Sequence, residues 1–206
     1  TGKTSMQGLL SNFRNTMIVS LLLSVVMIVG YMVHNRGADV IFVQAVFRWM
    51  HLVFGILWIG LLYYFNFVQI RKMPDIPAEM KPAISKHIAP EALFWFRWAA
   101  LFTLVSGLAL AWSRGFLLEA LSLGAASGFV VPQHTFIGVG MWLAIIMFLN
   151  VWLFIWPNQK IALGMVEADD AAKAKAGRTA MLFSRTNTLL SLPMLVTMAM
   201  NQTIFG

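Results

Sequence analysis

Apolar residues are gathered into five long runs, and polar or charged segments separate them. The runs cover residues 17–33, 40–70, 92–112, 135–157 and 181–203. Because an α-helix rises about 1.5 Å per residue, four of the runs are long enough to cross a hydrocarbon core of about 30 Å, and the first is close to the minimum. The pattern predicts an all-α, polytopic integral membrane protein in which five transmembrane helices form a single membrane domain over residues 1–206. We expect spans 2 to 5 to form a helical bundle.

Two of the polar segments have features of their own. Residues 113–133 contain apolar stretches that Gly115, Gly124 and Pro132 interrupt. They are too short and too broken to span a bilayer, so we expect a helix at the interface or a re-entrant piece. Residues 158–179 alternate Ala with Lys and acidic residues, which predicts a solvated helical extension between spans 4 and 5.

The composition supports a membrane location and narrows the possible chemistry. Of 206 residues, 59% are hydrophobic and 11% are charged, whereas a soluble domain carries about 25% charged residues. No cysteine occurs, which excludes disulfides, thiolate catalysis, iron–sulfur clusters and covalent c-type haem attachment. The net charge of +7 is interpreted as a feature of membrane topology rather than of nucleic-acid binding, and the lipid bilayer is the expected partner.

Lysine and arginine are distributed unequally between the two sides of the predicted domain. With five spans, the N-terminus and the segments after spans 2 and 4 share one side, and the other side holds only Arg36 and Arg114. The basic residues of the first side are Lys3, Arg14, Arg71, Lys72, Lys81, Lys86, Lys160, Lys173, Lys175 and Arg178. Loops rich in Lys and Arg stay in the cytoplasm. We therefore expect a protein of the bacterial inner (cytoplasmic) membrane whose N-terminus is cytoplasmic.

Span 2 carries the residues best suited to hold a cofactor. His51, Gly55 and Trp58 follow one another at spacings of four and three, which places an imidazole, a missing side chain and an indole on one face of the helix. Arg48 lies one turn before His51, and ionisable groups within a span are functional candidates because burying them in lipid is costly. A face of Gly and Trp also serves helix packing, and a histidine also makes interhelical hydrogen bonds, so both interpretations stay open.

Without cysteine, imidazole is the natural axial ligand for a haem inside a membrane protein. We predict a b-type haem bound through His51, with Gly55 leaving room beside the ring, Trp58 forming an apolar wall and Arg48 near a propionate. His134, at the start of span 4, is the second candidate ligand, although the depths of the two histidines differ by up to about 10 Å. A methionine or a vacant sixth position is the alternative.

Spans 4 and 5 carry further polar groups at membrane depth. Asn150, Arg185 and Asn187 are expected to face one another or a cavity, because unsatisfied polar atoms in lipid cost several kcal/mol. Arg97 in span 3 has aromatic neighbours, so it either makes a cation–π contact or reaches toward the headgroups, which we favour. The glycines expected to permit close helix packing are Gly55, Gly60, Gly138 and Gly140.

Four blocks of sequence lie along spans 2 to 5. The first is Phe47-Arg48-Trp49-Met50-His51 with Gly55, Trp58-Ile59-Gly60 and Tyr63-Tyr64-Phe65, and the second is Pro90-Glu91-Ala92-Leu93-Phe94-Trp95-Phe96-Arg97-Trp98 with Thr103 and Ser106-Gly107. The third is Asn150-Val151-Trp152 with Ile155-Trp156-Pro157-Asn158-Gln159-Lys160, and the fourth is Ser184-Arg185-Thr186-Asn187-Thr188 with Leu192-Pro193. In order and register these blocks resemble the N-terminal domain family of the membrane-bound urate oxidases (urate hydroxylases).

The resemblance implies an oxidoreductase role of the kind used in purine catabolism, with electron transfer through a haem. Typical members of that family carry more spans, a His- and Gly-rich loop and a C-terminal c-type cytochrome with a Cys-x-x-Cys-His motif. The chain resembles a short form without these parts. Electrons are then expected to leave through a separate cytochrome partner.

Two other interpretations are kept. The pattern His-x-x-x-Gly-x-x-Trp-x-Gly, from His51 to Gly60, is similar to the first helix of the haem-b-binding protoporphyrinogen oxidase family of membrane proteins. The chain is alternatively a non-catalytic subunit that packs within a larger respiratory or photosynthetic membrane complex.

Overall fold

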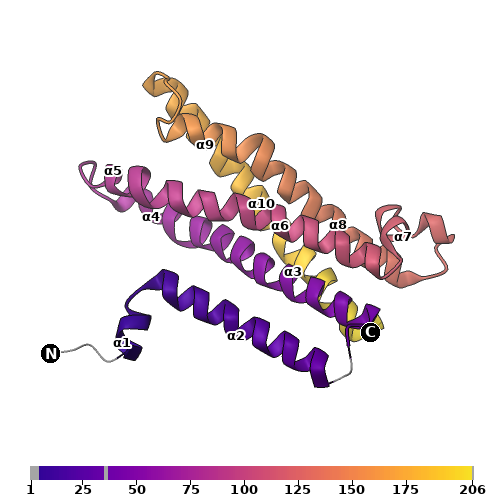
Figure 1. Ribbon diagram of the computed structural model, residues 1–206. Helices are drawn as coiled ribbons and strands as arrows, with labels where there is room; N and C mark the ends of the chain where they lie inside the picture. The colour runs from indigo at the N-terminus through magenta and orange to yellow at the C-terminus, as the bar shows by residue number, and fades with distance from the viewer. Residues whose placement is uncertain (1–4, 35–36, 206) are drawn as a thin grey trace. The chain divides into compact units, whose positions relative to one another are not determined.

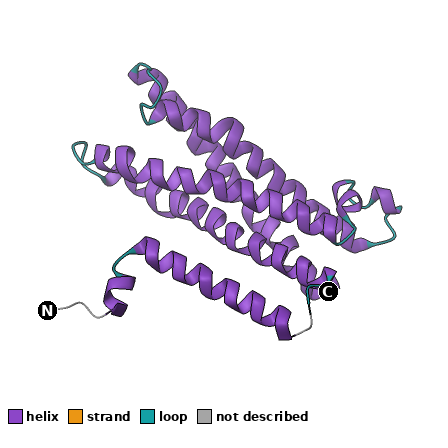
Figure 2. Ribbon diagram, in the orientation of Figure 1, coloured by secondary structure: helices purple, strands orange, loops and turns teal. Residues whose placement is uncertain are grey.

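The computed structural model describes residues 5–34 and 37–205, and within these residues it contains helices, turns and loops without a β-strand (Figure 2). Among the described residues, five continuous helical stretches are long and apolar enough to cross a membrane. They are Phe13–His34, Val40–Asp75, Lys81–Ser113, Pro132–Ala162 and Asp170–Phe205. The predicted class, all-α with five membrane-spanning helices, is confirmed.

The chain forms two compact units, residues 1–43 and 44–206. In the first unit, α1 (Ser5–Leu10) turns directly into α2 (Phe13–His34). The Thr16 hydroxyl fixes this turn, because it donates to the backbone carbonyl of Leu9 at 3.1 Å. The first predicted span, residues 17–33, therefore lies inside a helix that begins four residues earlier.

The second unit begins within α3 (Val40–Tyr63), which continues through a π-helical turn, η1 (Tyr64–Gln69), into α4 (Ile70–Lys72). The 3₁₀ turn η2 (Met73–Asp75) ends this stretch. A short connection then leads to α5 (Lys81–Ala83), the π-helical η3 (Ile84–Ile88) and the long α6 (Ala89–Ser113). Pro74 lies in η2, whereas Pro82 and Pro90 lie within the continuous stretch Lys81–Ser113. Proline is tolerated in the first turn of a helix, and Pro82 and Pro90 occupy that place in α5 and α6.

After α6 the chain makes a compact excursion and returns. It consists of α7 (Leu117–Leu121) and the 3₁₀ turn η4 (Ala125–Ser127), and two glycines with positive φ, Gly124 and Gly128, flank η4. The excursion is folded back against α8, because Ala120 of α7 is fully buried there in a small apolar cluster with Ile137 and Met141. This agrees with the expectation that residues 113–133 do not span.

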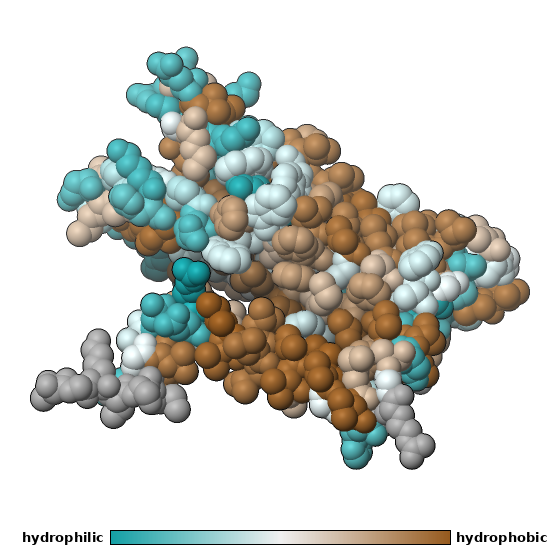
Figure 3. All heavy atoms as spheres, in the orientation of Figure 1, coloured by the Kyte–Doolittle hydropathy of each residue, from teal (hydrophilic) through white to brown (hydrophobic). Residues whose placement is uncertain are grey.

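The last two spans form a long antiparallel pair. The first runs through α8 (Pro132–Leu149), the π-helical η5 (Asn150–Ile155) and α9 (Trp156–Ala162), and the second is α10 (Asp170–Phe205). The predicted solvated helical extension after span 4 is the beginning of α10. Within this unit, Figure 1 shows α5 and α9 at one end of the bundle and α7 at the other. Hydrophobic residues cover the middle of these helices, and hydrophilic residues gather at the α5 and α9 end (Figure 3).

The core of the second unit is apolar and draws on all four of its long helices. Trp58, Leu62, Phe96, Met147 and Met194 belong to one buried cluster. Elsewhere glycines allow closer approach. A side chain at Gly140 of α8 would collide with the Thr197 hydroxyl of α10, and one at Gly138 would collide with the carbonyl of Ala120.

The expectation that Gly60 is a packing glycine is wrong. A Cβ added at Gly60 would meet nothing within 4 Å, because this position of α3 faces outward. Position on a helix face, rather than residue type, decides whether a glycine brings two helices together.

A pair of glycine substitutions tests this packing. Gly140→Ala should destabilise the protein by about 1–3 kcal/mol, because the added methyl group overpacks the contact with Thr197. Gly60→Ala should be neutral or stabilising by up to about 1 kcal/mol, because alanine is the better helix former and has open space there. The measurement is unfolding in mixed detergent micelles, and equal effects of the two substitutions would contradict the packing described.

The number of spans and the distribution of basic residues together predict the topology. An odd number of spans predicts termini on opposite sides, and the ten Lys and Arg residues given above predict a cytoplasmic N-terminus. A reporter fused to the C-terminus should therefore be active only outside the cytoplasm. Activity of the C-terminal fusion on the cytoplasmic side would be incompatible with an odd number of spans in this orientation.

Candidate functional site

His51 of α3 is held against α6 by one hydrogen bond and one close contact. Its Nδ1 lies 2.9 Å from the backbone carbonyl of Thr103. A carbonyl only accepts, so Nδ1 carries the hydrogen and Nε2 keeps its lone pair. The ring lies directly over Gly107, since a Cβ added there would be 2.7 Å from Cε1. The imidazole is thus fixed in orientation and in tautomer.

The other residues of the predicted face are packed rather than open. Gly55 faces Thr103, whose Cγ2 would lie 3.8 Å from an added Cβ. Trp58 is 1% exposed, and its indole nitrogen has no hydrogen-bond partner among the described residues. Gly55 therefore serves the approach of α3 to α6, and Trp58 forms part of the apolar core.

Arg48 lies one turn from His51 and contacts the end of α10. Its guanidinium donates to Oε1 of Gln202 at 2.7 Å, and among the described residues no carboxylate forms an ion pair with it. Gln44, one turn earlier, donates to the carbonyl of Ser113 at 2.8 Å. This end of the bundle therefore presents a cation that is bonded only to a neutral amide.

His134 lies in the first turn of α8 and has different neighbours from His51. Its ring stacks on Phe116 at 6.1 Å between centroids and 22° between planes, and Nδ1 is 3.3 Å from the Ser127 hydroxyl. Phe116 follows the end of α6 at Ser113, whereas His51 lies beside Thr103 and Gly107 within α6. The six residues from Gly107 to Ser113 alone correspond to about 9 Å along the axis. The structure does not bring the two histidines together.

The residues described form no group of three or more His, Asp or Glu side chains suited to a metal ion. A metal held only by protein side chains is therefore not suggested anywhere in the described chain.

The polar pair Asn150 and Asn187 joins η5 to α10 inside the bundle. Asn150 Nδ2 donates to Asn187 Oδ1 at 2.8 Å, and Asn187 Nδ2 donates to the carbonyl of Met147 at 2.9 Å. Asn187 is fully buried and Asn150 nearly so. Arg185, predicted to share this site, is exposed and lies on another face of α10. The structure thus brings two of the three predicted residues together.

Two further polar contacts join α3 to α10 and were not foreseen. Tyr63 lies 3.0 Å from the Ser191 hydroxyl, and Asn66 Nδ2 donates to the Ser184 hydroxyl at 2.8 Å. The sequence of α10 contains a pattern that could have predicted these contacts. The buried residues of α10 recur at spacings of three and four, and most are small or polar: Ala176, Ala180, Ser184, Asn187, Ser191, Met194, Thr197 and Asn201.

Arg97 of α6 makes the cation–π contact that was the less favoured alternative. Its guanidinium lies 3.4 Å from the centroid of the Trp156 ring, and Lys160 approaches the same ring at 5.7 Å. The contact joins α6 to the end of the fourth span. Arg97 is thereby held at the level of Trp156 rather than extended freely along its helix.

The buried asparagine pair leads to a stability prediction. Asn187→Leu leaves the buried Asn150 amide nitrogen without its acceptor and removes the side-chain donor to the Met147 carbonyl, which should lower the free energy of unfolding by about 1–3 kcal/mol. Thr186→Leu, on the exposed face of α10, is the matched control and should change it by less than about 0.5 kcal/mol. Both are measured by unfolding in mixed micelles. Indistinguishable effects would mean that the pair does not stabilise the bundle.

Comparison with known proteins gives one family. Residues 115–205 match the family described as "Urate oxidase N-terminal", and this segment extends from the α7 excursion to the end of α10. No curated protein matches, and no solved structure matches. The matched segment contains His134, Asn150, Arg185 and Asn187, whereas His51 and its neighbours precede it. The chain is therefore a membrane helical protein in which residues 115–205 are similar to the urate oxidase N-terminal family.

Proposed function

We propose that this chain is a redox protein of the bacterial inner membrane, related to the membrane-bound urate oxidases, that binds b-type haem through His51 and passes electrons to a separate cytochrome. The family match over residues 115–205 supports the relationship. The environment of His51 supports the cofactor. No support was found for the resemblance to protoporphyrinogen oxidases.

The single observation that carries the proposal is the hydrogen bond from His51 Nδ1 to the Thr103 carbonyl. Histidines that ligate a metal usually donate their other ring N–H to a carbonyl or carboxylate, which fixes the ring and raises the basicity of the ligating nitrogen. His51 has this arrangement, with Nε2 as the available nitrogen. A haem bound there supplies one-electron chemistry, which none of the protein's own side chains provides.

Arg48 is suited to a propionate of the proposed haem. It lies one helical turn from His51, and its bond to the neutral Gln202 amide leaves its charge unbalanced. A carboxylate would replace or share that bond, because charge-assisted hydrogen bonds are roughly twice as strong as neutral ones. Arg48 would then orient the group, while His51 provides the ligand.

The positions of the histidines favour His51 as the only histidine ligand. His134 lies beside Phe116 beyond the end of α6, at a different level along the bundle axis. Two histidines that held the same iron would have to lie at the same level of the bundle, which His51 and His134 do not. We therefore assign His134 to the packing of the α7 excursion against α8.

A second candidate function, the non-catalytic subunit, is supported by the same hydrogen bond. The bond to Thr103 and the contact with Gly107 give His51 a complete structural role in joining α3 to α6 without a cofactor. Under this alternative the protein should co-purify with a larger membrane complex and show no Soret band. Under the redox proposal it should show the spectrum of a b-type haem and support oxidation of a purine.

The decisive measurement is the reduced-minus-oxidised absorption spectrum of the purified protein. The wild-type protein should show a Soret band, and His51→Ala should lose it. Gly107→Ala should reduce the band strongly, because the added methyl group would lie 2.7 Å from the imidazole ring and displace it. His134→Ala and His87→Ala are the matched controls and should retain the band.

Two results would contradict the proposal in different ways. A colourless preparation from haem-replete cells would remove the haem assignment and favour the packing subunit. A band that persists in His51→Ala would keep the haem and move its ligand to another residue.

A further inference from the structure

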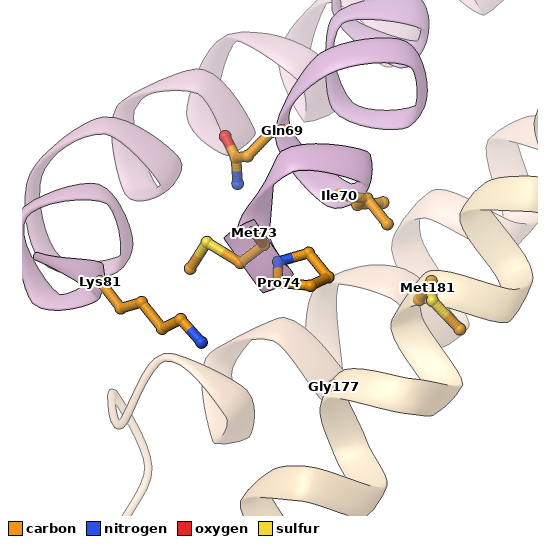
Figure 4. A pocket seen from close by; sticks show the side chains of 7 residues that line it. All are labelled: Gln69, Ile70, Met73, Pro74, Lys81, Gly177 and Met181. Atoms are coloured by element: carbon orange, nitrogen blue, oxygen red, sulfur yellow. The ribbon is translucent and has the colours of Figure 1, made fainter. Parts of the chain in front are cut away.

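A cavity of about 370 Å³ opens at the end of the bundle that carries the basic loops. Its walls include Gln69 and Met73 from the second span, Lys81 from α5, and Gly177 and Met181 from α10. Figure 4 shows the Gln69 amide and the Lys81 amine directed into the space from two sides, with the Gln69 nitrogen nearer to Met73 and its oxygen turned away. The cavity is open to the outside and has a mostly apolar lining, and its volume is large enough to hold several water molecules beside the Gln69 and Lys81 side chains.

Two buried amide oxygens near this cavity lack a donor. Gln69 Oε1 and Asn66 Oδ1 are both inaccessible, and neither has a hydrogen-bond partner among the described residues. Both belong to the π-helical turn η1, at positions three residues apart. A buried amide oxygen without a donor costs about 1–3 kcal/mol, and a water molecule could supply the missing donor for each.

The wall formed by α10 continues from the cavity into the bundle. Gly177, Met181 and Ser184 are spaced by four and three residues, which places them on one face of the helix. Gly177 and Met181 line the cavity, and Ser184 accepts the hydrogen bond from Asn66 Nδ2 at 2.8 Å. The polar contact between Asn66 and Ser184 is therefore the next step inward from the cavity.

The same pairing of helices is repeated deeper in the bundle. Ser191 donates to the carbonyl of Thr188 at 2.7 Å, so its oxygen accepts from the Tyr63 hydroxyl at 3.0 Å. Ser184 is 5% exposed and Ser191 is fully buried. We call the set Gln69, Asn66, Tyr63, Ser184 and Ser191 the polar seam.

We propose that the polar seam is a hydrated inlet through which water and protons pass from the cavity to the Tyr63 and Ser191 pair. The cavity supplies the entrance, the two unpaired oxygens can accept from water, and hydroxyl groups that both donate and accept continue the path. The inlet does not depend on haem. In this proposal the contact between the second span and α10 has two roles: it packs the two helices together, and it lets water and protons pass.

Cysteine accessibility tests the inlet directly, because the chain contains no cysteine of its own. Single variants Ser184→Cys and Ser191→Cys in native membranes are treated with a small cationic methanethiosulfonate reagent. Met181→Cys, at the cavity wall, is the positive control. Leu189→Cys and Leu192→Cys, which are 74% and 65% exposed on the lipid side of the same helix, are the controls at matched depth.

A hydrated seam should make both serine positions react at least about tenfold faster than the two leucine positions, because only a thiolate reacts and a thiol in lipid does not ionise. Asn66→Leu should then slow the reaction of Ser191→Cys without slowing that of Met181→Cys. Elution of each variant as a single species in detergent confirms that it is folded. Rates at Ser184→Cys or Ser191→Cys equal to the leucine controls, with Met181→Cys reactive, would show that the seam is dry and overturn the proposal.

Discussion

The second unit of this protein depends on one constraint: polar groups inside a bilayer must find their partners within the protein. Asn187 satisfies this constraint for three elements at once, because it accepts from Asn150 and donates to Met147. The bond to Asn150 fixes the register between η5 and α10. Since lipid offers no hydrophobic force to drive helices together, such contacts and close packing carry the association. The long α10 is therefore positioned by a polar stripe rather than by a ridge of leucines.

Much of the fold follows from the chain's simplest pattern. A run of apolar residues that crosses a bilayer must form a helix, because its backbone N–H and C=O groups have no other partners in lipid. All five predicted spans correspond to helices. Glycine and proline between spans 3 and 4 similarly indicate a broken segment. The ends were less predictable, because helices continue into solvated residues where apolarity stops, as α10 does from Asp170 to Ala180.

The candidate site was predictable only in part, because helical spacing places residues on a face without saying what that face meets. The spacing of His51, Gly55 and Trp58 correctly indicated one face of a helix. It did not indicate that Gly107 of α6 would lie beneath the imidazole, or that Trp58 would be buried in the apolar core. Arg185 was grouped with Asn187 by sequence proximity, although two positions along a helix correspond to a rotation of about 200° and place it on another face.

The π-helical turns η1, η3 and η5 have a consequence for how this sequence can change. A π-helical turn holds one more residue than the α-helical turn it interrupts, so it is equivalent to a single insertion absorbed within a helix. Deleting one residue between Tyr64 and Gln69 would restore regular α-helical winding and rotate the two halves of the span by about 100° relative to each other. The direction in which Gln69 faces, relative to that of His51, therefore depends on that extra residue. The rotation of one half of this span relative to the other therefore depends on the number of residues between them as well as on which residues they are.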